Sequence, residues 1–85
     1  MKINRLYVKI MDKTQFEKYK KLGLNIAYYR KEKGYTQMEL SEILGIDRTH
    51  MGRIESANVG VSLDIIFKLC DVLQIPVNKL FEFRD

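Results

Sequence analysis

The stretch Thr36–Ser56, TQMELSEILGIDRTHMGRIES, decides the fold of this chain. Thr36 and Glu39 have the spacing of a capping box, in which the threonine hydroxyl and the glutamate carboxylate satisfy free N–H groups at a helix start. Gly45 suits the left-handed residue that ends a helix, and Asp47 can cap the next one. Two short helices joined by a glycine-containing turn form a helix-turn-helix unit.

Apolar residues recur at helical spacing in both halves of this stretch. We therefore predict helices over residues 37–44 and 48–56. The residues predicted to face inward are Leu40, Ile43, Leu44, Met51 and Ile54.

Three further helices are predicted around this unit. The first runs from Thr14, which opens a second capping box, to about Lys33. Ser62 caps a fourth helix, and Pro76 suits the first turn of a fifth, where a missing N–H costs nothing. The predicted inward residues are Phe16, Tyr19, Leu22, Ile26 and Tyr29 in the first helix and Leu63, Ile66, Leu69, Cys70 and Leu73 in the fourth. The expected fold is all-α with five helices.

Composition limits the function classes. The 85 residues suffice for one domain, contain no apolar run long enough to span a membrane and begin with no signal-peptide pattern. A single cysteine, Cys70, excludes an intramolecular disulfide and favours a cytoplasmic location. His50 is the only histidine, and no set of side chains has the spacing of metal ligands. We expect no enzyme activity, no metal and no cofactor.

Positive charge is concentrated at the N-terminal end. Residues 1–35 carry ten Lys or Arg against three Asp or Glu, a net charge of +7, whereas residues 36–85 carry five against eight, a net charge of −3. Such a run can be only a solvated helix face. Together with a helix-turn-helix, it favours a polyanionic partner, because Lys and Arg release counterions from phosphates.

Several residues of the chain occur in the same order as in a known family. The pattern of Gln37, Ser41, Gly45, Ile46, Met51 and Ile54 resembles the lambda-repressor/Cro-like (XRE-type) helix-turn-helix family, and the similarity runs from Leu22 to Phe81. The resemblance implies a five-helix lambda-repressor-like domain. It also implies a regulator of transcription that binds double-stranded DNA sequence-specifically as a homodimer, with repression as the favoured mode.

Candidate site residues follow from this arrangement. With Met51 and Ile54 facing inward, helix 48–56 would present its other face to the major groove. The candidate base contacts are Arg48, Thr49, Gly52 and Arg53, since Arg can bond bidentately to guanine. The candidate phosphate contacts at the start of helix 37–44 are Thr36 and Gln37, because a helix N-terminus favours anions. The resemblance implies two further phosphate contacts, Ser56 and Asn58. The resemblance further implies a buried ion pair between Arg30 and Glu55.

The N-terminal residues lie outside the resemblance. Residues 3–10, INRLYVKI, alternate apolar and polar positions, which predicts a short β-strand within an N-terminal arm, residues 1–13, ahead of a helix-turn-helix domain over residues 14–85. Such a strand needs a partner, either its equivalent in a second copy or the alternating segment at residues 81–84, and would then support dimerisation. The alternative is a basic tail that strengthens DNA binding.

A different function class also fits the resemblance. The same family includes antitoxin-like proteins that neutralise a toxin and repress their own operon. A protein-binding module of that kind is the alternative to a regulator that acts on DNA alone.

Overall fold

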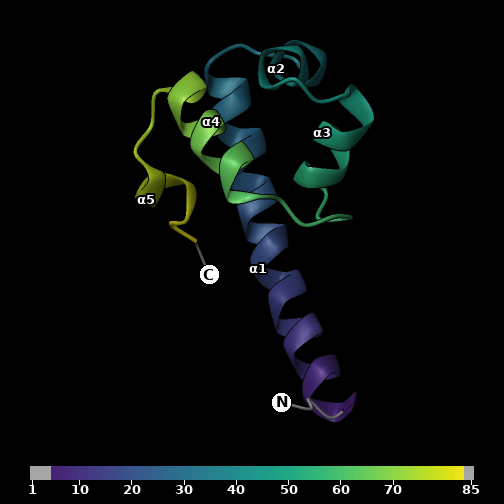
Figure 1. The fold of residues 1–85 in the computed structure, drawn as a ribbon. Helices are drawn as coiled ribbons and strands as arrows, with labels where there is room; N and C mark the ends of the chain where they lie inside the picture. The colour runs from purple at the N-terminus through teal and green to yellow at the C-terminus, as the bar shows by residue number, and fades with distance from the viewer. Residues whose placement is uncertain (1–4, 84–85) are drawn as a thin grey trace.

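The computed structural model describes the chain from residue 5 to residue 83, with side chains from residue 14 onward. Within this range the chain folds into helices and contains no strand (Figure 1). The helices are α1 (Arg5–Glu32), α2 (Gln37–Leu44), α3 (Arg48–Glu55), α4 (Leu63–Leu73) and α5 (Val77–Leu80). The prediction of an all-α, five-helix fold is confirmed.

The helix ends form through the local interactions that the sequence predicts. The Thr36 hydroxyl accepts a hydrogen bond from the Glu39 N–H (3.0 Å), and the Glu39 carboxylate accepts one from the Thr36 N–H (2.9 Å). Asp47 and Ser62 cap α3 and α4 by accepting from the N–H three residues later. Gly45 ends α2 with a φ of +75°, a conformation that glycine adopts without strain.

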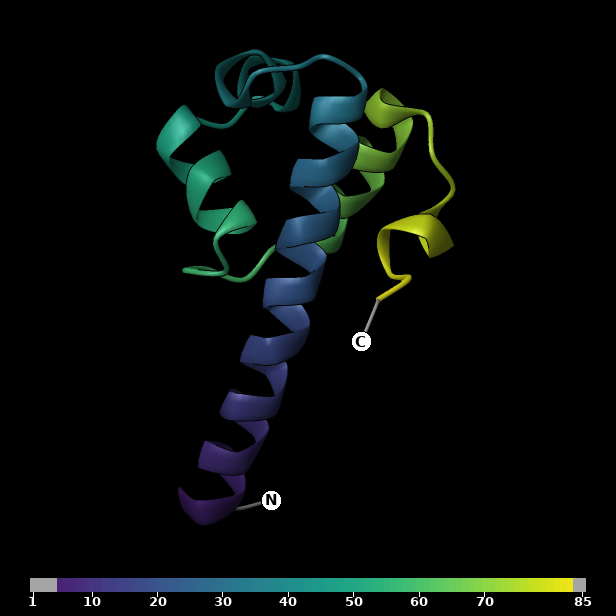
Figure 2. The same ribbon diagram turned by 180° about the vertical axis from the view of Figure 1, so that it is seen from behind.

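The helices pack around the C-terminal half of α1. In both views, α2 and α3 lie on one side of α1, and α4 and α5 lie on the other (Figures 1 and 2). Every helix contributes at least one residue to a shared apolar core. The core consists of Leu22, Ile26, Leu40, Leu44, Met51, Ile54, Ile66, Leu69, Cys70, Leu73 and Leu80.

Four residues predicted to face inward are exposed instead. On α2, Ile43 is 51% exposed, whereas Ser41 is buried together with Leu40 and Leu44. The inner face of this helix therefore holds residues 40, 41 and 44, and Ile43 lies on the solvent side. Leu63 lies in the first turn of α4, and the buried residues of that helix begin only at Ile66. The other two, Phe16 and Tyr19, precede the part of α1 that the bundle covers.

The predicted N-terminal strand is wrong for residues 5–10, which belong to α1. Alternation of apolar and polar residues over so short a segment favours a strand only weakly, and continuation of the adjoining helix is the alternative. No proline or glycine precedes Gly23, so nothing interrupts the N–H to C=O ladder, and adding a residue to an existing helix is favourable where starting one is not. The helix also runs through Thr14, the predicted N-cap, so the second capping box does not start a helix. Residues 3 and 4 of the predicted strand lie outside the described residues.

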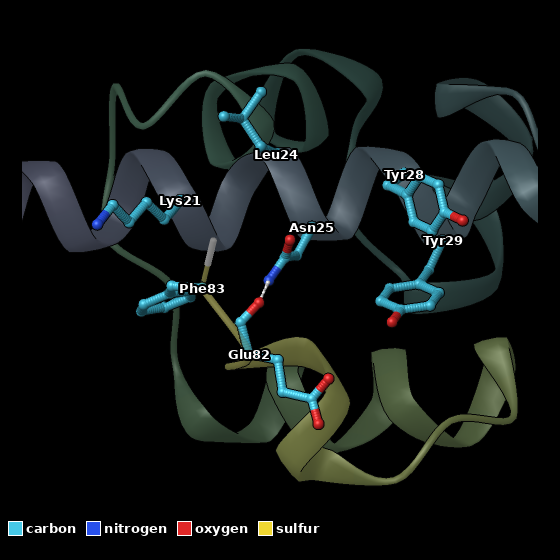
Figure 3. Close-up of a pocket in the computed structure, with 7 residues that line it drawn as sticks. All are labelled: Lys21, Leu24, Asn25, Tyr28, Tyr29, Glu82 and Phe83. Atoms are coloured by element: carbon cyan, nitrogen blue, oxygen red, sulfur yellow. Dashed lines mark hydrogen bonds between the residues drawn. The ribbon is translucent and has the colours of Figure 1, made fainter. Parts of the chain in front are cut away.

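The C-terminal segment folds back onto α1. The side-chain amide of Asn25 donates hydrogen bonds to the carbonyl oxygens of Leu80 (2.9 Å) and Glu82 (3.0 Å). Figure 3 shows Asn25 pointing from α1 to the segment after α5, beside an open pocket of about 350 Å³. Residues 81–83 therefore form no strand, and Arg84 of the predicted alternating segment lies outside the described residues.

Candidate nucleic-acid interface

A glycine allows α3 to lie directly against α1. A Cβ atom built at Gly23 would collide with the carbonyl oxygen of Glu55 and would lie 2.9 Å from that of Ile54. The buried side chains of Met51 and Ile54 fill the same contact. With its inner face held this closely, α3 turns its other face to solvent.

A buried ion pair fixes the C-terminal end of α3. The Nε atom of Arg30 lies 2.7 Å from Oε2 of Glu55, and its Nη2 atom lies 3.1 Å from Oε1, so the contact is bidentate. Both side chains are less than a tenth exposed. The structure thus brings together the two residues of the ion pair that the resemblance implies.

Two further partners complete this network. Arg30 also donates through Nη1 to the carbonyl oxygen of Tyr35 (2.8 Å), and the Gln37 amide donates to Oε1 of Glu55 (3.0 Å). The network therefore joins the end of α1, the loop after it, the start of α2 and the end of α3. Because the charges are paired and hydrogen-bonded, burial does not leave either one uncompensated. The angle between α2 and α3 is held by these bonds as well as by the apolar core.

The candidate base-contacting residues share the outer face of α3. Arg48, Thr49 and Arg53 are exposed, and Gly52 is partly exposed between them. A Cβ atom built at Gly52 would have only the side-chain oxygen of Gln37 within 4 Å, at 3.8 Å. Packing within the protein therefore does not require glycine at this position.

The candidate phosphate-contacting residues lie at two ends of this face. Thr36 and Gln37 are at the start of α2, where backbone N–H groups favour anions. Ser56 and Asn58 follow α3, and the Asn58 amide donates to the Ser56 hydroxyl (2.9 Å). Sequence reasoning missed that Gln37 already donates to Glu55, because the two residues lie 18 positions apart and local spacing gives no signal of that bond.

The ionisable groups with shifted pKa values are structural. Hydrogen bonding to the Thr36 backbone N–H and then to its side chain lowers the pKa of Glu39 below its usual 4.5, because both bonds favour the carboxylate. Burial raises the pKa of the Cys70 thiol above its usual 9.0, with a smaller effect from Asp71. Cys70 therefore stays a protonated, buried thiol at neutral pH.

The described residues provide neither a metal site nor a membrane-spanning helix. No group of three or more His, Cys, Asp or Glu side chains there is placed to hold a metal ion. No helix in that part of the chain is long and apolar enough to cross a membrane.

Comparison with known families agrees with this geometry. The profile of the helix-turn-helix family matches residues 26–80, from the C-terminal part of α1 through α5. The chain belongs to the XRE-type helix-turn-helix family. The N-terminal half of α1 lies outside the matched region.

Individual relatives give the same assignment. The HTH-type transcriptional regulator SinR of Bacillus licheniformis is 34% identical over 65 residues, which are 75% of this chain and 59% of SinR. The uncharacterized HTH-type transcriptional regulator YazB of Bacillus subtilis is 41% identical over 58 residues, 68% of this chain and 84% of YazB. The chain thus spans less than two thirds of the length of SinR.

A solved structure also matches the fold. The restriction-modification controller protein C.AhdI from Aeromonas hydrophila superposes with a TM-score of 0.73 and 33% identity. The match covers 78% of this chain and 96% of C.AhdI.

Proposed function

We propose that this helix-turn-helix protein binds double-stranded DNA sequence-specifically and regulates transcription. The observation that carries the proposal is the outer face of α3, where Arg48, Thr49 and Arg53 are exposed while Met51 and Ile54 anchor the inner face. A helix held rigidly at its base can enter the major groove with these side chains toward the base edges. The regulator names of SinR and YazB favour this function over an antitoxin-like module.

The two sets of candidate residues have different roles in this proposal. Arg48 and Arg53 read bases, because a guanidinium matches the two acceptors of guanine in the major groove. Thr36, Gln37 and the segment after α3 contact phosphates, which position the helix without reading sequence. Gln37 can do so through backbone N–H groups while its side chain remains bonded to Glu55.

We further propose that the protein acts as a homodimer on two half-sites. Exposed apolar side chains on α4 and after α5, including Leu63, Phe67 and Phe81, are available for contact with a second copy. In such a dimer, the α3 helices of the two protomers would be the recognition helices. Placed about 34 Å apart, they would enter the major groove at successive turns on one face of the DNA. Binding sites selected from random DNA should then contain two inverted half-sites about 10 base pairs apart, and one isolated half-site would contradict the dimer.

The same selection of bound fragments from random DNA provides the duplex for the main test, which measures how α3 variants bind it. On the selected duplex, Arg48→Ala or Arg53→Ala should each weaken binding by about 1–3 kcal/mol and relax the preference at one base pair per half-site. Gln37→Ala serves as the comparison, because it removes the amide bond to Glu55 that holds α2 against α3 and removes no base-contacting group, so it should weaken binding to all sequences more evenly.

The readout is the ratio of affinities for the selected duplex and a scrambled one. A fall in this ratio for both arginine variants supports base reading by α3. Equal losses on both duplexes would show that α3 is not the reader.

A further inference from the structure

The loop that follows α3, residues 57–61, leaves that helix in a fixed direction. Ala57 is buried and has a φ of +64°, a left-handed conformation that costs free energy for a residue other than glycine. The N–H groups of Ala57 and Asn58 donate to the carbonyl oxygens of Ile54 (3.2 Å) and Arg53 (2.9 Å). The first two residues of the loop are therefore held by the end of α3 itself.

Hydrogen bonds around Ser56 orient the side chain of Asn58. The Asn58 amide donates to the Ser56 hydroxyl oxygen (2.9 Å), and that hydroxyl donates in turn to the carbonyl oxygen of Arg53 (3.4 Å). A side-chain amide has two donor hydrogens, and the second one of Asn58 has no acceptor among the described residues. The Ser56 hydroxyl, by contrast, uses its single hydrogen on Arg53. Asn58 can therefore donate to a phosphate without breaking a bond, and Ser56 orients it.

Tyr19 of α1 supports the rest of this loop. Within the described part of the chain, positions 59–61 form no backbone–backbone hydrogen bond. Val59 and Val61 pack against the core, and Gly60 between them is exposed. A Cβ atom built at Gly60 would lie 3.4 Å from the Tyr19 hydroxyl oxygen and 3.6 and 3.9 Å from two carbons of its ring. The backbone at Gly60 therefore lies against the edge of the Tyr19 side chain.

This contact adjoins the place where α1 meets the end of α3. Tyr19 lies about one helical turn before Gly23, where the missing Cβ lets the backbone of Glu55 approach. Both views show the loop crossing α1 at the level beyond which the N-terminal half of that helix projects from the bundle (Figures 1 and 2). Tyr19 also precedes residues 26–80, the segment that the family profile matches. The loop is thus supported by a residue from outside that segment.

We propose that the ring of Tyr19 holds the loop after α3 in the position from which Asn58 contacts a DNA phosphate. This inference rests on the proposed function and adds a positioning residue to it. The loop contains no Lys or Arg, so a phosphate contact there depends on the placement of a neutral donor, whose hydrogen bond requires a short distance and a good angle. A loop that is already held against α1 also loses less conformational freedom when DNA binds.

The main test measures the affinity of Asn58→Ala, Tyr19→Ala and the double variant for the selected duplex. Asn58→Ala should weaken binding about tenfold, as expected for the loss of one hydrogen bond to a charged group. Tyr19→Ala should weaken it about fivefold, because the released loop occupies the binding position for only part of the time. The double variant should bind about as weakly as Asn58→Ala alone, because Tyr19 acts through Asn58. Losses that multiply in the double variant, or wild-type affinity of Tyr19→Ala, would overturn the inference.

Neutral methylphosphonates, placed singly in the selected duplex, give a readout that a change in stability alone does not produce. Neutralising the phosphate that Asn58 contacts should weaken binding of the wild type. Asn58→Ala and Tyr19→Ala should both lose most of their sensitivity at this phosphate and keep it at the others. A Tyr19→Ala protein with the wild-type pattern of sensitivity would contradict the positioning role.

Two further tyrosine variants separate the ring from the hydroxyl and from unrelated surfaces. Tyr19→Phe keeps the ring edge against Gly60 and should bind within about twofold of the wild type. A loss as large as that of Tyr19→Ala would show that the hydroxyl itself is needed and would overturn positioning by the ring. Tyr28→Ala removes an exposed tyrosine from the opposite face of α1 and should leave the affinity unchanged. An equal loss for Tyr28→Ala would contradict an effect through the loop.

Melting temperatures accompany these affinities, because Tyr19 also lines a pocket with Phe81 and Phe83. Affinities are compared well below the lowest melting temperature, so that every variant is folded. If the wild type binds the selected duplex specifically but Tyr19 and Asn58 act independently, only this inference fails. If the wild type binds no duplex specifically, the proposed function itself fails.

Discussion

Two glycines near the recognition helix have opposite surroundings. Gly23 lies under α3, where any side chain would collide with the backbone of Glu55. Gly52 lies in α3 itself, with only Gln37 Oε1 near the place of its missing Cβ. Glycine inside a helix costs about 1 kcal/mol relative to alanine, so at Gly52 the fold gains nothing from it. Close approach of the DNA backbone or bases to α3 is a reason for a glycine there.

Substitution by alanine separates these two cases. Gly52→Ala should raise the free energy of unfolding by up to about 1 kcal/mol and weaken DNA binding, because the added methyl group faces the groove. Gly23→Ala should lower the free energy of unfolding by about 1–3 kcal/mol through overpacking. Denaturant titration and DNA affinity are measured for both. A stabilised Gly52→Ala protein with wild-type affinity would show that DNA does not approach this position closely.

The buried ion pair gives a second prediction at the residue scale. Arg30→Met leaves the Glu55 carboxylate buried with only the Gln37 amide as a polar partner, which should cost about 3–5 kcal/mol of stability. Lys31→Met, which removes the same charge from the adjacent exposed position, should cost far less. Melting temperatures of the two variants provide the measurement, and equal values would contradict a structural role for the pair.

At the scale of a single element, the start of α2 responds to pH. The hydrogen bonds from Thr36 lower the folded-state pKa of Glu39, so the stability that this carboxylate contributes is present above its usual pKa of 4.5 and is lost as the pH falls through the lower folded value. Glu39→Gln keeps an acceptor but removes the charge. The wild type should melt at a higher temperature than Glu39→Gln at pH 7, and the difference should disappear as the pH falls below 4.5. A constant difference from pH 7 to pH 3 would show that ionised Glu39 does not stabilise the cap.

At the scale of the whole molecule, the bundle and the projecting half of α1 are separable. The buried residues that the structure describes all lie from Leu22 onward, so removing residues 1–13 takes away no described part of the core. The shortened protein should keep a cooperative unfolding transition within about 1 kcal/mol of the wild type, with a lower helix signal in circular dichroism. Loss of cooperative unfolding would show that the projecting half supports the bundle.

The sequence alone determined the helix-turn-helix and the family. The capping box at Thr36, the left-handed Gly45 and the period of apolar residues act within a few residues, so α2 and α3 could be located to within one residue at each end, and the start of α4 after Ser62 could be located as well. The same periodicity indicated which side of α3 would be exposed, and therefore which residues became candidates for base contact. The partnership of Arg30 with Glu55 could be suggested only through the resemblance.

Tertiary structure decided the features that depend on distant segments. The side to which Ile43 and Leu63 face, the bond from Gln37 to Glu55 and the attachment of the C-terminal segment through Asn25 all depend on how helices pack, which local periodicity does not encode. The N-terminal residues are the clearest case. Alternation over residues 3–10 fits a strand, but a strand needs a partner to satisfy its backbone groups, whereas a helix satisfies them within the segment itself. With an established helix adjoining and no strand beside it in the described chain, residues 5–13 continue α1.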